Sequence, residues 1–216
     1  MPKDLPSGIR GKITIQLNQK KMNLSTLKNA FLQFAHFSEQ EIDLITGNAI
    51  VEKISRKTKM LAPNEICKRM YFVISGCLRL YYVKSDGNEV NCFFFHEGLF
   101  CTAFGSFMKQ KKSNQYLEAI EDTVCISITY EELERLYVEL PNMNILVRKI
   151  LEERYTNAHE IISSYILDNP ETRYLKFRKQ YPLLINRLAE YHIASYLGIT
   201  PKSLSRLKKR LAKKVT

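Results

Sequence analysis

Residues 190–207 read EYHIASYLGITPKSLSRL, and this stretch predicts two helices joined by a tight turn. Ala194 is small at the point where the second helix must cross the first closely. Gly198 falls at the turn, where a positive φ costs little only for glycine. Thr200 can cap the next helix, and Pro201 suits its first position. The stretch therefore predicts a helix-turn-helix.

The second helix of this pair has two chemically different sides. Leu204 and Leu207 fall on one side together with Leu211, and we expect them to pack against the rest of the protein. The opposite side carries basic residues at spacings of four, three and four: Lys202, Arg206, Lys209 and Lys213. A helix with an apolar inner side and a basic outer side suits the major groove of duplex DNA.

We expect the outer side to contact both bases and phosphates. The residues expected to read base edges are Lys202, Ser203, Ser205 and Arg206. The residues expected to meet phosphates are Thr200, Lys208, Lys209, Arg210 and Lys213. Two alternatives stay open. One is an ordinary helical hairpin with a solvated basic surface, and the other is a regulatory module whose basic tail docks onto a protein or a membrane.

The charge distribution also favours a polyanionic partner. The chain has 216 residues and a formal net charge of +11, and residues 183–216 hold eight basic residues against the single acid Glu190. No apolar run is long enough to span a bilayer, and Met1–Met22 lacks the apolar core of a secretory signal. We therefore expect a cytoplasmic protein without a membrane partner.

The sequence contains no motif typical of an enzyme or a metal site. Its five cysteines show no C-x-x-C spacing: Cys67, Cys77, Cys92, Cys101 and Cys125. Free, mostly buried thiols in a reducing compartment are the favoured interpretation, and a redox or iron–sulfur sensor is the alternative. His96 is expected to be structural, with haem ligation as its alternative.

The rest of the chain divides into three patterns. Residues 23–50 look helical, and residues 51–129 look like short strands that include a hairpin at Asp86-Gly87. Residues 138–167 predict one long helix with a broad apolar stripe, for which a dimer seam is favoured over packing within the chain. The seam residues are Val147, Leu151, Tyr155, Ala158 and Ile162. On the same helix, Glu152-Glu153-Arg154 is interpreted as a solvated face.

Segments along nearly the whole chain then resemble the Crp/Fnr superfamily, the family of the cyclic-AMP receptor protein: the Asp86-Gly87 turn matches its hairpin, and residues 118–124 look like the strand that closes its β-roll. Residues 70–80 (MYFVISGCLRL) look like its strand pair, residues 97–100 like its turn before the phosphate-binding cassette, and residues 191–206 like its helix-turn-helix. The resemblance implies an α+β fold. Its parts are an N-terminal cyclic-nucleotide-binding-like β-roll (jelly-roll) with flanking helices, a long dimerisation helix and a C-terminal winged-helix domain.

The resemblance also implies domain boundaries and partners. It predicts a sensor domain over 1–137, a dimerisation helix over 138–167 and a DNA-binding domain over 168–216. It implies a homodimer on double-stranded DNA, an unknown small-molecule effector, and RNA polymerase as a further candidate partner. The effector pocket is expected at Phe100, Thr102, Ala103, Phe104, Gly105, Ser113 and Asn114.

Several departures from the family pattern bear on the effector. Ala103 stands where cyclic-AMP binders have a glutamate for the ribose, and residues 112–116 contain no arginine for the cyclic phosphate, although Lys109, Lys111 or Lys112 could substitute. Cyclic-AMP is therefore disfavoured and no cofactor is expected. No cysteine precedes Cys67, which disfavours the iron–sulfur mechanism of the family. The wing that usually follows the second helix is expected to be truncated.

Overall fold

The computed structural model describes residues 25–47 and 49–215, with side chains to residue 213. After a helix over residues 25–32, the N-terminal elements are α2 (Glu39–Gly47), β1 (Ile50–Ile54), β2 (Lys59–Leu61), β3 (Arg69–Ser75), β4 (Leu78–Val83), β5 (Glu89–Phe95), β6 (Phe100–Cys101), α3 (Phe104–Lys109), β7 (Tyr116–Ala119) and β8 (Thr123–Thr129). The C-terminal elements are α4 (Tyr130–Glu139), α5 (Pro141–Leu167), α6 (Pro170–Gln180), α7 (Glu190–Tyr196) and α8 (Pro201–Val215). Expectations for residues 1–24, 48 and 216 lie outside the described residues.

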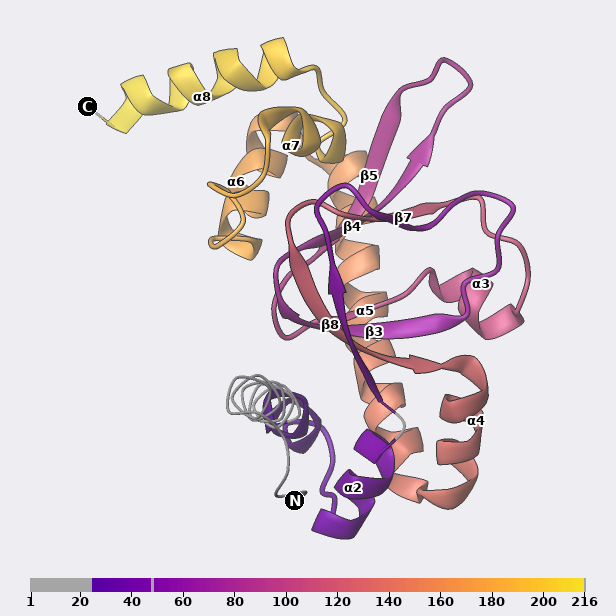
Figure 1. Ribbon diagram of the computed structural model, residues 1–216. Coiled ribbons are helices and arrows are strands. Elements are labelled where there is room, and N and C mark those ends of the chain that lie inside the picture. Colours follow the sequence, from indigo (N-terminus) through magenta and orange to yellow (C-terminus); the bar gives the residue numbers. More distant parts are fainter. Residues whose placement is uncertain (1–24, 48, 216) are drawn as a thin grey trace, which may run out of the picture.

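The strands form two antiparallel sheets, as the β-roll expectation requires. One sheet has the order β1-β8-β3-β6 and the other β2-β7-β4-β5. Apolar side chains of both sheets, among them Val73 and Leu78, share one buried core. Figure 1 shows α5 running along this β-roll, with α4 and α2 at one end and α6, α7 and α8 at the other.

Local sequence explains where the strands turn. At the β3–β4 turn, Gly76 has φ +98, and a Cβ there would lie 2.5 Å from the Thr123 Oγ1 atom, so only glycine fits. At the β4–β5 hairpin, Gly87 has φ +82 and Asp86 accepts a hydrogen bond from the Asn88 N–H at 2.9 Å. The Asp86-Gly87 hairpin prediction is therefore confirmed.

The helical segments differ from the sequence expectation at two places. The N-terminal helical region is interrupted over residues 33–38, after which Ser38 and Glu41 form the predicted capping box around the start of α2. The long helix begins at Pro141 rather than at 138. Leu140, which precedes the proline, is extended and separates α4 from α5 (φ −126, ψ 97).

The described part of the chain contains two core clusters. The first fills the β-roll and extends to α4 and to the first half of α5 through Met143, Leu146 and Val147. The second joins α6, α7 and α8, and it also includes Phe94 and Cys77 from the β-roll. The C-terminal helices are therefore packed onto the β-roll by a shared apolar core.

Candidate functional site

The turn between α7 and α8 has the geometry that the sequence predicts. Gly198 has φ +67, and a Cβ at this position would meet the Tyr165 ring at 3.0 Å. The Ile199 N–H donates to the Ala194 carbonyl at 3.0 Å, which closes the turn. The Thr200 hydroxyl accepts from the Ser203 N–H at 3.1 Å and caps α8. Gly198 and Thr200 therefore fix the angle at which α8 leaves α7.

The apolar side of α8 is buried as expected. Leu204 and Leu207 lie in the second core cluster beside Ala194, which is fully buried where the two helices cross. Burying each leucine contributes about 1.5–3 kcal/mol relative to leaving it in water. This packing determines which side of α8 faces solvent.

The outer side of α8 is polar and basic. Lys202, Ser203, Arg206, Lys209 and Lys213 are exposed, and Ser205 is half-buried. Within the described residues, no carboxylate lies within ion-pair distance of Arg206. Figure 1 shows α8 at the margin of the molecule, with α6 and α7 between it and the β-roll.

Two of the predicted phosphate contacts are engaged within the chain. The Lys208 ammonium lies 2.6 Å from the Glu190 carboxylate, and the Arg210 guanidinium lies 2.5 Å from the Glu171 carboxylate. Both basic groups are largely exposed, so each pair stabilises the fold by less than about 1 kcal/mol. These ion pairs hold Lys208 against α7 and Arg210 against α6, and breaking either pair costs little free energy.

A buried arginine ties the helix-turn-helix to the β-roll, and sequence reasoning missed it. The Arg79 guanidinium donates to the carboxylates of Glu89 at 2.5 Å and Glu118 at 2.8 Å. It also donates to His192 Nδ1 on α7 at 3.2 Å. Asn91 on β5 adds a bond from its side-chain amide to the His192 carbonyl at 3.1 Å. The sequence offered one signal for this contact, because Arg79 is a charged residue between the apolar residues Leu78 and Leu80 of β4.

This environment keeps His192 neutral. Burial is the largest cause and the positive charge of Arg79 is the next, and together they lower the pKa of His192 to about 4. Glu89 and Glu118 oppose this shift, and Arg56 adds to it. Because Nδ1 accepts from Arg79, a proton on Nδ1 would break the contact between α7 and the β-roll.

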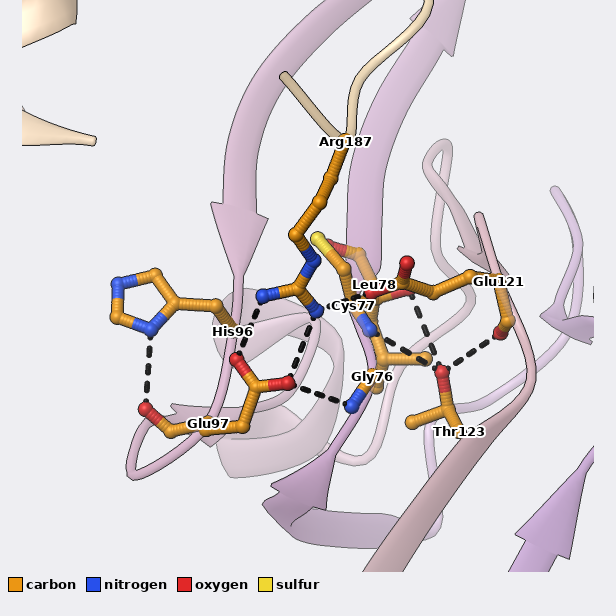
Figure 2. Close-up of polar contacts among 8 residues, drawn as sticks. All are labelled: Gly76, Cys77, Leu78, His96, Glu97, Glu121, Thr123 and Arg187. Carbon is orange, nitrogen blue, oxygen red and sulfur yellow. Dashed lines mark hydrogen bonds and ion pairs between the residues drawn. The ribbon is translucent and has the colours of Figure 1, made fainter. Parts of the chain in front are cut away.

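A second ionic contact joins the two parts and is drawn in Figure 2. Arg187, between α6 and α7, makes two hydrogen bonds to the Glu97 carboxylate, at 3.0 and 2.9 Å, and also pairs with Glu121. Burial opposes ionisation of Glu97, but the bonds from Arg187 and from the Gly76 N–H outweigh burial and lower its pKa. We call this the Arg187 clamp.

Strand β5 faces two different environments because its side chains alternate. Phe93 and Phe95 line a cavity between the β-roll and α5. Phe94 points the other way, into the core of the C-terminal helices, where its ring centroid lies 5.5 Å from that of Tyr196. One strand therefore contacts both the cavity and the helix-turn-helix domain.

The cavity has a volume of about 460 Å³ and contains part of the predicted effector pocket. Phe100, Thr102, Phe104 and Gly105 line it as expected. Ala103 is buried and does not line it, Ser113 is buried and bonded to Gln115, and Asn114 is exposed. Gln115 lines the wall instead, one residue beyond the predicted pair.

Among the described residues, Arg154 on α5 is the one charged side chain that lines this cavity, and the expectation of a solvated face is wrong for it. Its guanidinium donates to the Phe100 carbonyl at 2.8 Å and lies 4.9 Å from the centre of the Phe95 ring. Burial lowers its pKa, although the group stays charged at neutral pH. The missed signal was helical spacing, because residues 151, 154, 155 and 158 share a face.

These walls do not fit a cyclic nucleotide. A ribose and a cyclic phosphate need several hydrogen-bond partners, and burying polar groups without partners is costly. Ala103 supplies no carboxylate, and none of Lys109, Lys111 and Lys112 lines the cavity. The walls are mostly aromatic and aliphatic, with Thr102, Gln115, Arg154 and Tyr155 as the polar exceptions.

The seam residues of α5 are distributed over different environments. Val147 is buried in the chain's own core, and Leu151 and Ala158 line the cavity. Tyr155 and Ile162 are exposed. Further exposed apolar side chains follow toward the end of α5: Tyr165, Ile166 and Leu167. Apart from Ile145, which is 39% exposed, the apolar surface of α5 that is available to a partner therefore lies in the second half of the helix.

The remaining titratable residues have structural surroundings. His96 Nδ1 lies 3.0 Å from the Glu97 carbonyl, and its ring packs edge-on against Tyr181. All five cysteines are free and four are buried, as the sequence predicts. Burial raises the pKa of Cys77 and of Cys125 to about 12.

In the described residues, no group of three or more His, Cys, Asp or Glu residues could hold a metal ion. None of the helices in the described segments is long and apolar enough to span a bilayer.

Comparison with known proteins agrees with this architecture. Residues 51–139 match the family described as "Cyclic nucleotide-binding domain". The chain is 24% identical over 132 residues to the Global nitrogen regulator of Nostoc sp., an alignment that covers 59% of this chain and 58% of that protein. The chain therefore spans less than two thirds of the length of that curated relative.

Solved structures extend the likeness to the C-terminal helices. The c-di-GMP-responsive global regulator CLP of Xanthomonas campestris has a TM-score of 0.68 at 17% identity, over 82% of this chain and 93% of that one. A regulator described as Crp/Fnr family from Eubacterium rectale has a TM-score of 0.66 at 17% identity, over 82% of this chain and 85% of that one. Residues 51–139 therefore form a cyclic nucleotide-binding domain, and the chain as a whole has the fold of these solved regulators.

Proposed function

We propose that this protein is a DNA-binding transcription regulator that works as a homodimer and reads a near-palindromic site through α8. One observation carries the proposal: α8 buries Leu204 and Leu207 while Lys202, Arg206 and Lys209 face solvent. In a dimer, two such helices about 34 Å apart enter successive major grooves. The exposed apolar end of α5 supports the dimer. We infer no catalytic role, a cytoplasmic site of action, and RNA polymerase as a further partner.

The assignment of roles along α8 follows from its geometry. Lys202, Ser205 and Arg206 lie in the first two turns of α8, where side chains reach base edges in this docking mode. Lys209 and Lys213 lie farther along and meet phosphates, as do Lys208 and Arg210 once their ion pairs open. The hydroxyls of Thr200 and Ser203 bond to each other at 2.9 Å, so they serve the cap before they serve DNA.

Regulation in this proposal works through the contacts between the two domains. The helix-turn-helix is attached to the β-roll by Phe94, by the Arg79–His192 bond and by the Arg187 clamp. An effector that changes the β-roll then changes the placement of α8. Such coupling requires two arrangements of the molecule that differ in DNA affinity.

The test is selection of binding sites from a random duplex library, followed by titration of the selected site. Arg206→Ala is compared with wild type, with Arg178→Ala on α6 as an arginine control in the same domain. We expect Arg206→Ala to lose about 1–3 kcal/mol of discrimination at one base pair of each half-site. We expect Lys209→Ala to weaken all sequences alike and to reduce the salt dependence. Full sequence preference in Arg206→Ala would overturn the base-reading assignment.

A further inference from the structure

The cavity between the β-roll and α5 has an apolar wall on nearly every side. Its volume of about 460 Å³ lies in the range that accommodates small organic ligands. The β-roll contributes Phe93, Phe95 and Phe100, and α5 contributes Ile150, Leu151 and Ala158. A ligand that fills this space must therefore be apolar over most of its surface.

Arg154 is the exception, and its hydrogen-bonding capacity is largely unused. A guanidinium offers five N–H donors, and one of them donates to the Phe100 carbonyl at 2.8 Å. Across residues 25–47 and 49–215, no carboxylate lies within ion-pair distance of Arg154. Glu153 favours the charged form of Arg154 only from beyond ion-pair distance. A half-buried cation without a carboxylate in direct contact is costly, and an anion from outside the chain would relieve that cost.

We propose that this cavity binds a small organic monocarboxylate with an apolar body, such as a medium-chain fatty acid or an arylalkanoic acid, whose carboxylate pairs with Arg154. The planar guanidinium matches a carboxylate through two parallel hydrogen bonds. The single cation accounts for a single negative charge on the ligand, and the aromatic wall accounts for its apolar body. The described wall has no further charged residue, which disfavours ligands that carry several charges or many hydroxyls.

The position of Arg154 suggests how such a ligand would act, an inference that rests on the proposed function. Arg154 is bonded to the Phe100 carbonyl on β6, and it faces a second cavity that is lined by His96 and Tyr181. Tyr181 belongs to the core of the C-terminal helices. A carboxylate that draws the guanidinium away from Phe100 would therefore disturb residues that support the helix-turn-helix. Phe93 and Phe95 provide a second connection, because Phe94 lies between them.

The test is calorimetric titration of the full chain with octanoate, 1-octanol and octylamine, which share one apolar body and differ in the head group. We expect octanoate to bind at least about tenfold more tightly than octanol, and octylamine to bind more weakly than both. Arg154→Met should bind octanol as wild type does and lose the preference for octanoate. Arg154→Lys should keep part of that preference. Arg148→Met, on the exposed side of the same helix, should behave as wild type.

A cavity-filling variant locates the bound ligand. Ala158→Phe should fill the cavity and abolish binding of both octanoate and octanol. Circular dichroism measures whether each variant is folded. If Arg154→Met does not fold, the comparison of octanoate with octanol is made on Arg154→Lys. Equal affinity for octanoate and octanol in wild type would overturn the proposal, as would cyclic-AMP that binds more tightly than octanoate and displaces it. Because this titration contains no DNA, its failure leaves the role of α8 untouched.

Discussion

His192 is a titratable residue at the contact between the β-roll and the helix-turn-helix. Its pKa in the folded chain is about 4, whereas an unfolded histidine titrates near 6.5. Between these values the unfolded chain binds more protons, so the free energy of unfolding falls as pH decreases from about 6.5 to 4. At pH values below both pKa values, the lowered pKa of His192 reduces the free energy of unfolding by about 3 kcal/mol relative to neutral pH.

We therefore predict that His192→Asn flattens the pH dependence of stability in this window. Asparagine retains an acceptor for Arg79 but has no titrating group. Chemical denaturation of wild type and variant at pH 7, 5.5 and 4.5, followed by circular dichroism, measures the effect; these pH values are set from the shift of His192. Parallel pH profiles for the two proteins would show that another group controls the acid side.

At the scale of single elements, sequence patterns correctly predicted the features that depend on neighbouring residues, such as helix caps and turns. The cap at Thr200, the turn at Gly198 and the buried position of Leu204 are all confirmed. Each depends on residues within a few positions of one another. The pattern could not predict that Arg154 enters a cavity, because its partner Phe100 lies 54 positions away. The same limit applies to Arg79 and His192, whose contact depends on how α7 docks on β4 and β5.

Strand β5 provides an element-scale prediction, because neighbouring phenylalanines face different surroundings. Phe94 is 1% exposed and packs among the rings of Phe177, Tyr181 and Tyr196. Phe94→Ala should lower the free energy of unfolding by about 3–5 kcal/mol and loosen α6 and α7 before the β-roll unfolds. Hydrogen exchange resolved along the chain measures this loosening. Phe93→Ala, which enlarges the cavity, should leave protection of α6 and α7 close to wild type.

At the scale of the whole molecule, the order of the parts was predictable and their docking was not. The order of β-roll, long helix and helix-turn-helix follows from periodicity and from the family resemblance. The shared core around Phe94 and Cys77 follows only from the folded arrangement. Sequence reasoning assigned the whole stripe of α5 to one seam, whereas the structure divides it. Its first half packs on the chain's own core, its middle lines the cavity, and its end remains exposed.

This division predicts where the proposed dimer can be broken without unfolding the chain. Ile162 and Ile166, on the second half of α5, are 59% and 75% exposed. A glutamate at either position would place a charge in an apolar seam, so Ile162→Glu and Ile166→Glu should convert the dimer to a monomer in sedimentation experiments. Val138→Glu is the matched control, because Val138 is also apolar and exposed but lies on α4.

The monomeric variants also separate assembly from recognition. Because α8 is intact in them, they should bind a single half-site with the base preference of wild type but lose the affinity that two linked half-sites provide. Competition between full and half-sites in an electrophoretic binding assay measures this difference. If a monomeric variant still prefers the full site, the two chains on DNA contact each other through a surface other than the second half of α5. A dimer that persists in both variants would place its contacts outside the second half of α5.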